Sequence, residues 1–185
     1  WRDRKGDPAW PHLFEKGLGV TWFIPTVENG RRNVEYLEER KQENGKEIVK
    51  CILRTEIGEI YELYEDGWKQ KFYLETPQDY AVMTYVVRHE EILPCYEKYA
   101  EMDRRIGEYG IPMVAMGRTP MQTILVDYAG VEQFSFHLFD NADAVMELYH
   151  ALLENFRKRV YLAAEGPGRY LSVLENFTAE TMGPG

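Results

Sequence analysis

The segment Ile111–Met116, with the sequence IPMVAM, decides the fold that we expect for this chain. It is a continuous apolar run between Gly110 and Gly117, which is the pattern of a strand buried on both faces of a parallel sheet. A second strand is predicted within residues 169–176, RYLSVLEN. We expect the two strands to lie side by side in one sheet and to point in the same direction.

Helices are predicted between these two strands. Pro120 opens the first helix and Gly130 ends it, and a further short helical or irregular piece follows. The longest helix starts at Asn141 and keeps an apolar stripe of 3.6-residue period as far as Gly166. This strand and helix rhythm predicts the α/β fold class, with residues 111–185 as the first part of an incomplete, truncated (β/α)8 TIM-type barrel.

A different pattern precedes the barrel segment. Residues 34–75 contain short runs of alternating apolar and polar residues, and the runs are separated by the turn pairs Asn44-Gly45, Ile57-Gly58 and Asp66-Gly67. Asn-Gly and Asp-Gly supply the positive φ angles that tight hairpins need. These residues therefore predict an antiparallel β-hairpin meander.

The rest of the chain is predicted to be helical or irregular. Thr76 as N-cap, a proline at the first helical position and Asp79 mark the start of a helix. Residues 76–110 are predicted to form a helical connection. Residues 1–33 are predicted to be a separate N-terminal segment with one short helix and a strand at Val20–Ile24.

Composition and charge narrow the classes of function. The 185 residues are 44% hydrophobic and 29% charged, which is typical of a globular protein, and no apolar run approaches the roughly 20 residues of a membrane span. The formal net charge of −9 argues against a nucleic-acid partner. Cys51 and Cys95 are isolated, which predicts free thiols. We expect a cytoplasmic protein with no membrane or nucleic-acid partner.

Two stretches resemble segments of the uroporphyrinogen decarboxylase superfamily: PMVAMGRTPMQTILVDYAG (residues 112–130) and YLSVLENFTAETMGP (residues 170–184). The resemblance covers residues 111–185 and implies a (β/α)8 barrel. That superfamily contains cofactor-free porphyrinogen decarboxylases and corrinoid-linked methyltransferases. The Arg-Gln-Ala-Gly-Arg segment of the decarboxylases is not found here, and Asn176 stands in place of their Ser. We therefore expect the methyltransferase branch, with a decarboxylase and a non-catalytic fragment or binding domain as alternatives.

The resemblance also implies cofactors and partners. Enzymes of the methyltransferase branch bind a thiol as thiolate on zinc and exchange a methyl group with a corrinoid. The resemblance places the zinc ligands in the second half of the barrel, so no metal ligand is expected in this stretch. A small-molecule substrate and a corrinoid protein are the implied partners.

The chain is expected to be an incomplete polypeptide. It begins on Trp1 and stops where the next element should begin, whereas a full barrel needs about 250 residues. The unpaired strand edges and the apolar stripe of the long helix would then have to be covered by another protein surface or remain exposed to solvent. We therefore expect self-association as a homo-oligomer, or an exposed apolar patch.

Candidate site residues follow from the barrel geometry, in which chemistry lies in loops after the carboxyl ends of the strands. They are Gly117, Arg118 and Thr119 after the first strand, Glu175, Asn176 and Thr178 after the second, and Tyr128, which is added on the resemblance alone. Glu175, Asn176 and Tyr128 are the catalytic candidates, and the other four are expected to bind substrate. A solvated Arg118, a Glu175 that caps a helix or pairs with Arg118, and a packing role for Tyr128 are the structural alternatives.

Overall fold

The computed structural model describes residues 9–175, which divide into two compact units. Of these residues, unit 1 contains 9–28, 94–117 and 160–173, and unit 2 contains 29–93, 118–159 and 174–175. Each unit is therefore held together by contacts between stretches that are far apart in the sequence.

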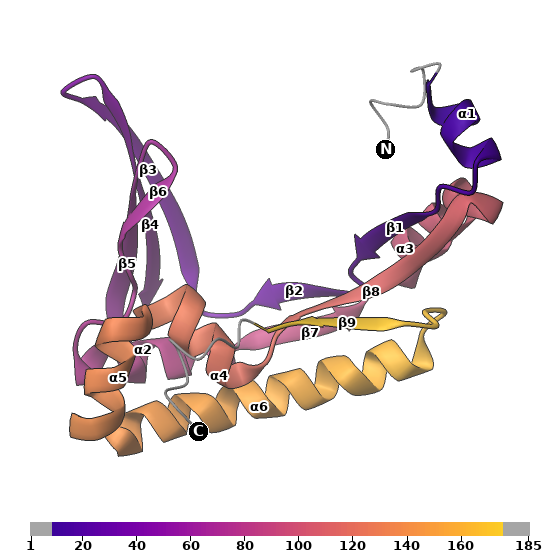
Figure 1. The fold of residues 1–185 in the computed structure, drawn as a ribbon. Coiled ribbons are helices and arrows are strands. Elements are labelled where there is room, and N and C mark those ends of the chain that lie inside the picture. The colour runs from indigo at the N-terminus through magenta and orange to yellow at the C-terminus, as the bar shows by residue number, and fades with distance from the viewer. Residues whose placement is uncertain (1–8, 176–185) are drawn as a thin grey trace. The chain divides into compact units, whose positions relative to one another are not determined.

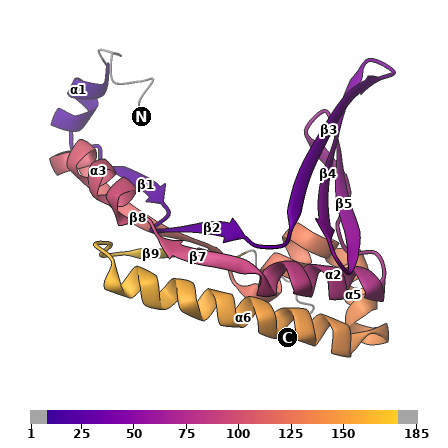
Figure 2. The same cartoon turned by 180° about the vertical axis from the view of Figure 1, so that it is seen from behind.

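The predicted meander is present in unit 2. Four strands, β3 (Glu35–Glu43), β4 (Lys46–Thr55), β5 (Gly58–Glu65) and β6 (Trp68–Lys71), form an antiparallel sheet in that order. Figure 1 shows the strands side by side, and Figure 2 shows the same sheet from behind. The prediction of an antiparallel meander is confirmed.

The Asn-Gly and Asp-Gly turns have the backbone geometry that tight hairpins require. Asn44 and Gly45 have φ angles of 52° and 81°, and Asp66 and Gly67 have φ angles of 46° and 81°. Two successive residues with positive φ characterise the type I′ turn, whose twist matches that of the strands it joins. The register of the sheet is therefore set by these local sequence signals.

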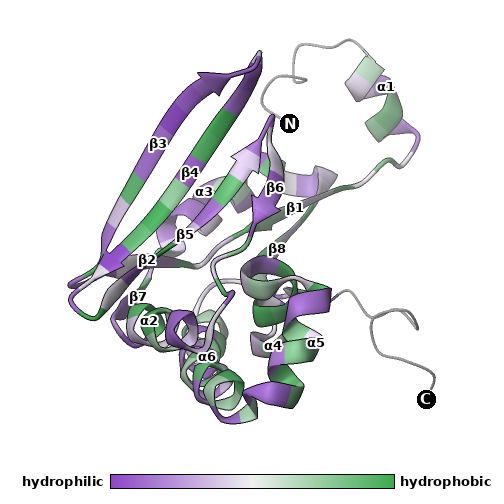
Figure 3. Cartoon of the chain, turned by 90° about the vertical axis from the view of Figure 1, so that its left-hand side faces the viewer, coloured by the Kyte–Doolittle hydropathy of each residue, from purple (hydrophilic) through white to green (hydrophobic). Residues whose placement is uncertain are grey.

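The second strand of the meander carries most of its apolar packing. Cys51, Ile52 and Leu53 of β4 are buried, whereas β3 is exposed along nearly its whole length. Figure 3 shows this contrast as a largely hydrophilic β3 beside a more hydrophobic β4. Leu53 pairs with Ile60 of β5, and both join the hydrophobic core of unit 2. The charged edge strand β3 disfavours pairing with another sheet.

Helix α2 (Pro77–Arg88) follows the meander and begins at the predicted N-cap. The Asp79 backbone N–H donates to the Thr76 hydroxyl, and the Asp79 carboxylate accepts from the Thr76 N–H at 2.7 Å. This reciprocal pair is a capping box, which satisfies backbone donors that the first turn leaves free. The helix then buries one face, which carries Tyr80, Met83 and Val87.

Loss of the N-cap is expected to have a measurable effect on stability. We expect Thr76→Ala to lower the free energy of unfolding by about 1 kcal/mol, because the Asp79 N–H loses its side-chain acceptor. Thr76→Ser keeps the hydroxyl and should stay close to the native value. Urea denaturation followed by circular dichroism measures both variants, and equal stabilities of the alanine and serine variants would contradict this account.

The remaining helices of unit 2 surround its core. They are α4 (Pro120–Gln122), the π-helix η3 (Thr123–Ala129), α5 (Val131–Asp140) and the part of α6 (Ala142–Glu165) before residue 160. The fully buried side chains of this core include Leu74, Ile124, Val145 and Leu148. Strand β7 (Glu90–Pro94) interrupts residues 76–110, which were predicted to be a helical connection, and it forms a two-stranded sheet with β2 (Val27–Arg31).

Unit 1 contains the sheet on which the fold prediction rests. Strands β1 (Val20–Ile24), β8 (Gly110–Arg118) and β9 (Leu171–Leu174) form a three-stranded sheet in the order β1-β8-β9. Helices α1 (Ala9–Glu15) and α3 (Tyr96–Ile106) belong to the same unit.

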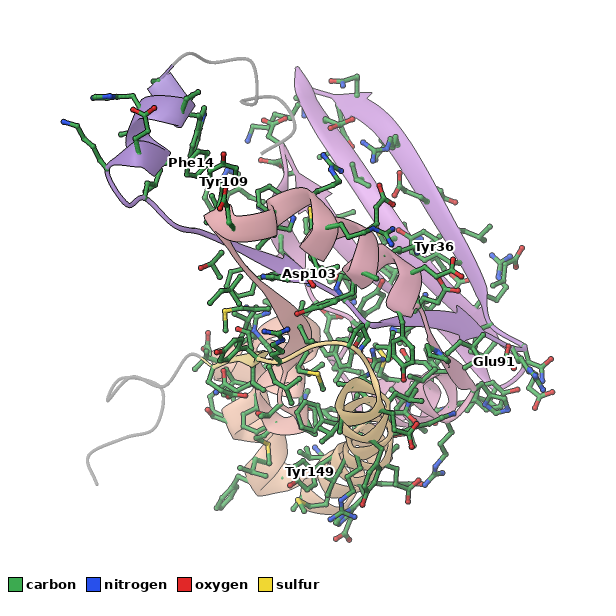
Figure 4. All side chains as sticks on the ribbon, turned by 90° about the vertical axis from the view of Figure 1, so that its right-hand side faces the viewer. Phe14, Tyr36, Glu91, Asp103, Tyr109 and Tyr149 are labelled. Atoms are coloured by element: carbon green, nitrogen blue, oxygen red, sulfur yellow. The ribbon has the colours of Figure 1, made fainter. Side chains whose placement is uncertain are left out.

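Strand β1 belongs to this sheet although its residues were assigned to a separate N-terminal segment. It pairs in parallel with β8, from Val20 opposite Gly110 to Ile24 opposite Val114. Residues on either side of the pair also meet: the rings of Phe14 and Tyr109, both labelled in Figure 4, have centroids 4.5 Å apart. The parallel sheet therefore begins at residue 20 and not at residue 111.

Strands β8 and β9 are neighbours in one sheet, as predicted, and their contacts have the offset of parallel strands. The Val114 N–H donates to the Tyr170 carbonyl at 2.8 Å, and the Thr119 N–H donates to the Glu175 carboxylate at 2.9 Å. In both contacts the two residue numbers differ by 56, and a constant difference is the mark of parallel strands. In antiparallel strands the sum of the two residue numbers would be constant instead. The carboxyl ends of β8 and β9 consequently lie at the same edge of the sheet.

One expectation about this sheet needs correction. Burial along β8 alternates, with Pro112, Val114 and Met116 buried and Ile111 49% exposed, so β8 is covered on one face and not on both. Its buried face packs with Ile24, Tyr99 and Ala163, which come from β1, α3 and α6. In residues 9–175 the strands form open sheets, and none of these sheets closes into a barrel. The structure establishes a mixed α/β fold.

Several apolar side chains of the parallel sheet are exposed. They include Phe23 at 54%, Leu171 at 45% and Val173 at 41% exposure. Exposed apolar side chains are therefore present on β1 and β9, and the expected self-association or apolar patch remains a prediction. None of the helices between residues 9 and 175 combines the length and apolarity that crossing a bilayer requires.

Candidate functional site

The candidate site lies where β8 and β9 end. Gly117, near the end of β8, has a φ of 75°, a left-handed conformation that favours glycine. Arg118 and Thr119 follow directly and lead into α4. Glu175 is the residue after β9. The turn at Gly117 and the parallel pairing of the strands thus bring these two segments to one edge.

A hydrogen bond joins the two segments. The Thr119 backbone N–H donates to Glu175 Oε1 at 2.9 Å. A carboxylate that accepts from a backbone amide makes a charge-assisted bond with fixed geometry. Glu175 is therefore held in place by one of its oxygen atoms.

The second oxygen of Glu175 and one nitrogen of Arg118 are buried without a partner. Among residues 9–175, Glu175 Oε2 and Arg118 Nε have no hydrogen-bonding partner. Leaving a buried charged group unsatisfied is costly, and native structures contain few such groups. The two atoms are complementary in function, because Nε–H is a donor and Oε2 is an acceptor. A polar ligand that carries both an acceptor and a donor would satisfy them.

Arg118 is held by a carboxylate that sequence reasoning did not select. Its Nη1 lies 3.4 Å from Asp127 Oδ1, so Asp127, and not Glu175, is its ion-pair partner in the part of the chain that is described. Burial raises the pKa of Asp127, and the positive charges of Arg118 and Lys69 oppose this effect. The only sequence signal for Asp127 is its position one residue before Tyr128 in the segment that follows the loop.

Tyr128 lies in a packing environment, as its structural alternative expects, and its catalytic role stays a prediction. It packs against the core of unit 2, and its ring makes an edge contact with that of Tyr73, with centroids 6.4 Å apart. Its carbonyl accepts from the Leu74 N–H at 3.0 Å. Burial, with a smaller contribution from Glu90, raises the pKa of Tyr128 well above the usual range. Its hydroxyl therefore stays protonated.

The structure shows less about the other predicted site residues. Thr119 takes part through its backbone amide, and its side chain makes no cap hydrogen bond. Asn176 and Thr178 lie outside the described residues. Between residues 9 and 175 no group of three or more His, Cys, Asp or Glu side chains is arranged to hold a metal ion.

A groove elsewhere in unit 2 is a weaker candidate for a ligand site. It has a volume of about 800 Å³ and lies on the meander sheet, lined by β3, β4 and β5. Most of its charges have partners: Lys46 pairs with Glu65 and Lys41 with Glu43 inside the groove, and Arg40 pairs at 3.2 Å with Glu47, which is not part of the lining. In exposed ion pairs of this kind the two charges already satisfy each other, and each pair contributes little to stability. The unsatisfied buried atoms at Arg118 and Glu175 make a stronger case for a ligand.

The comparisons with known proteins do not assign the chain to a family. A scan against known protein families finds no match, and a search of curated protein sequences finds no significantly similar one.

Proposed function

We propose that this chain forms the front part of an α/β enzyme of the uroporphyrinogen decarboxylase type, and that the enzyme transfers a methyl group to or from a corrinoid cofactor. The resemblance of residues 112–130 and 170–184 supports the family. The observation that carries the site is the pair of buried, unsatisfied atoms, Arg118 Nε and Glu175 Oε2, next to the carboxyl ends of two neighbouring strands. Barrel enzymes place their chemistry at such strand ends.

Each residue has a defined role in this proposal. Arg118 binds an anionic oxygen of the substrate through its Nε edge, while Asp127 holds the guanidinium at Nη1. Glu175 accepts a hydrogen bond or a proton from the substrate at Oε2, while the Thr119 amide fixes Oε1. The substrate is consequently a small molecule with an anionic group and a donor group.

The cofactor supplies the remaining chemistry. A corrinoid, when bound, supplies the transferable methyl group. Zinc, which the resemblance implies for the complete enzyme with ligands in the second half of the barrel, belongs to the proposal without a ligand assigned among residues 9–175. The proposal also includes a (β/α)8 barrel in which β1, β8 and β9 are neighbouring strands, a corrinoid protein as partner, self-association and a cytoplasmic location.

Methyl transfer in the complete polypeptide that contains this chain tests the proposal. Methylcobalamin is the donor, and mercaptoacetate is a small anionic thiol acceptor. The thiol proton would pass to Glu175 Oε2 and from there to solvent, the sulfur would form a bond to the methyl carbon, and the cobalt–carbon bond of the added methylcobalamin would break with its electron pair kept by the cobalt of the released cob(I)alamin. The absorbance of cob(I)alamin and the mass of the thioether report the reaction.

Matched variants connect the activity to the site. We expect Arg118→Gln and Glu175→Gln each to lower kcat/KM by about 100-fold, because each removes a charged contact to substrate. Arg88→Gln is the control, since Arg88 is 55% exposed and pairs with Glu147 on the surface. Corrinoid-dependent transfer that is lost in the two site variants and kept in the control supports the proposal. Absence of transfer, equal activity in all variants, or decarboxylation without corrinoid would overturn it.

A further inference from the structure

Lys69 of strand β6 is a half-buried cation with two polar partners. Its Nζ lies 2.6 Å from Glu62 Oε2 and donates to the backbone carbonyl of Asp127 at 2.9 Å. The Lys69 side chain is 21% exposed and that of Glu62 is 13% exposed. The ammonium also lies 4.9 Å from the centroid of the Phe72 ring. Because the Lys69 ammonium is partly buried and bonds to both Glu62 and the Asp127 carbonyl, the position of the side chain is fixed.

Its contact with Asp127 falls on an unusual helical segment. Asp127 lies in the π-helix η3, a form that occurs mostly as short pieces and frequently at functional sites. Two carbonyls at the end of η3 accept hydrogen bonds from outside the helix: that of Asp127 from Lys69, and that of Tyr128 from the Leu74 N–H. Strand β6 and the residues after it therefore hold the backbone of η3 where the Asp127 side chain emerges.

A continuous chain of charged contacts results. Glu62 pairs with Lys69, Lys69 binds the Asp127 backbone, and the Asp127 carboxylate pairs with Arg118. The meander sheet is thereby connected to the guanidinium whose Nε is buried without a partner. Residue 69 is 58 positions away from residue 127, so folding alone brings them together.

We infer that Lys69 is a positioning residue of the candidate site: it holds the Asp127 backbone so that the Asp127 carboxylate orients Arg118 toward the ligand. Lys69 does not touch the ligand. The inference rests on the proposed function only for the identity of the site, and the contacts themselves do not depend on the reaction that the site performs. In this inference the meander sheet, through Lys69, helps to orient Arg118 in addition to its structural role.

The charges around Asp127 predict shifts in the pKa of its carboxyl group that loosened packing alone would not produce. Asp127 faces Arg118 from β8, Lys69 from β6 and Glu62 from β5. The two cations lower its pKa and Glu62 raises it. Removing Lys69 should therefore raise the titration midpoint of the Asp127 carboxyl, and neutralising Glu62 should lower it.

The experiment compares Lys69→Met, Lys69→Arg and Glu62→Gln by NMR titration of the Asp127 side-chain carboxyl carbon, which is assigned with Asp127→Asn. We expect an upward shift for Lys69→Met, a downward shift for Glu62→Gln, and a midpoint near the native one for Lys69→Arg. The control is Lys50→Met. Lys50 lies on the same sheet with its Nζ 4.3 Å from the Tyr61 ring centroid, and it is half-buried as Lys69 is. Its removal should leave the Asp127 midpoint unchanged.

A kinetic measurement extends the test to the reaction. In the methyl-transfer assay Lys69→Met should lose about tenfold in kcat/KM, and Lys69→Arg should recover most of the loss, as is typical of residues that orient a binding group. An unchanged Asp127 midpoint in a folded Lys69→Met protein, or equal shifts in Lys69→Met and Lys50→Met, would overturn the inference. The titration needs no enzymatic activity, so its failure is distinguishable from failure of the proposed function.

Discussion

Gly110→Ala is expected to break the pairing of β1 with β8 and to lower the stability of unit 1 by about 3 kcal/mol. A Cβ atom at residue 110 would overlap the Val20 carbonyl oxygen and would lie 2.7 Å from its carbonyl carbon. These are backbone atoms, so no side-chain rotation relieves the overlap. Because Val20 and Gly110 form the first pair of the ladder, the strand must move away as a whole.

Amide hydrogen exchange gives the residue-specific measurement for this variant. Protection of the β1 amides should fall sharply in Gly110→Ala, whereas protection in the β3–β6 meander should be unchanged. Gly19→Ala is the matched control, because a Cβ atom at residue 19 meets nothing within 4 Å. Native protection of β1 in Gly110→Ala would show that the two strands do not pair as described.

The second large effect is expected at the buried pair formed by Tyr80 and His137. Tyr80 Oη and His137 Nδ1 are hydrogen-bonded at 3.0 Å, and the two residues are 1% and 5% exposed. The other ring nitrogen of His137, Nε2, lies 3.2 Å from the Glu75 carbonyl oxygen. The pair therefore connects α2 with α5 and satisfies polar groups that have no access to water.

We expect His137→Leu to lower the free energy of unfolding by about 2–3 kcal/mol, because it leaves the Tyr80 hydroxyl buried without its partner. Tyr80→Phe should have a smaller effect, since it leaves only His137 Nδ1 without its partner, whereas His137→Leu also removes the contact with the Glu75 carbonyl oxygen. Once the hydroxyl is absent, His137→Leu should cost about 1 kcal/mol less than in the native background.

A double-mutant cycle in urea measures this coupling. The four proteins are the native chain, His137→Leu, Tyr80→Phe and the double variant. A coupling of about 1 kcal/mol or more supports the hydrogen bond. Strictly additive effects would show that the two side chains pack independently.

The parts of the fold that the sequence predicted have local causes. The turns at Asn44-Gly45 and Asp66-Gly67 need positive φ angles, and the helix start at Thr76 is set by a capping box within four residues. The long helix α6 follows from its own apolar period. Each signal is complete within a few residues, so the sequence is sufficient to identify it.

The parts that were missed depend on contacts between distant residues. Strand β1 is recognised as part of the parallel sheet only through its pairing with β8, 90 positions later. The one-sided burial of β8 depends on what covers each face of the sheet, which an apolar run does not reveal. The π-helical form of η3 likewise has no distinct sequence pattern.

The candidate site divides in the same way. The rule that strand ends carry chemistry selected Arg118, Thr119 and Glu175, and the structure brings these three residues to one edge. Asp127 and Lys69 were not selected, because their roles arise from the packing of η3 against β6. Tyr128 was proposed on resemblance alone, and the structure gives it a packing environment.

The neighbouring, same-direction arrangement of β8 and β9 underlies both the fold and the site, and NMR scalar coupling across hydrogen bonds tests it most directly. We predict a coupling between the Val114 amide nitrogen and the Tyr170 carbonyl carbon, and interstrand contacts that keep an offset of about 56 positions along both strands. Contacts whose residue numbers keep a constant sum would show antiparallel strands. That result, or the absence of any contact between the two strands, would contradict the account.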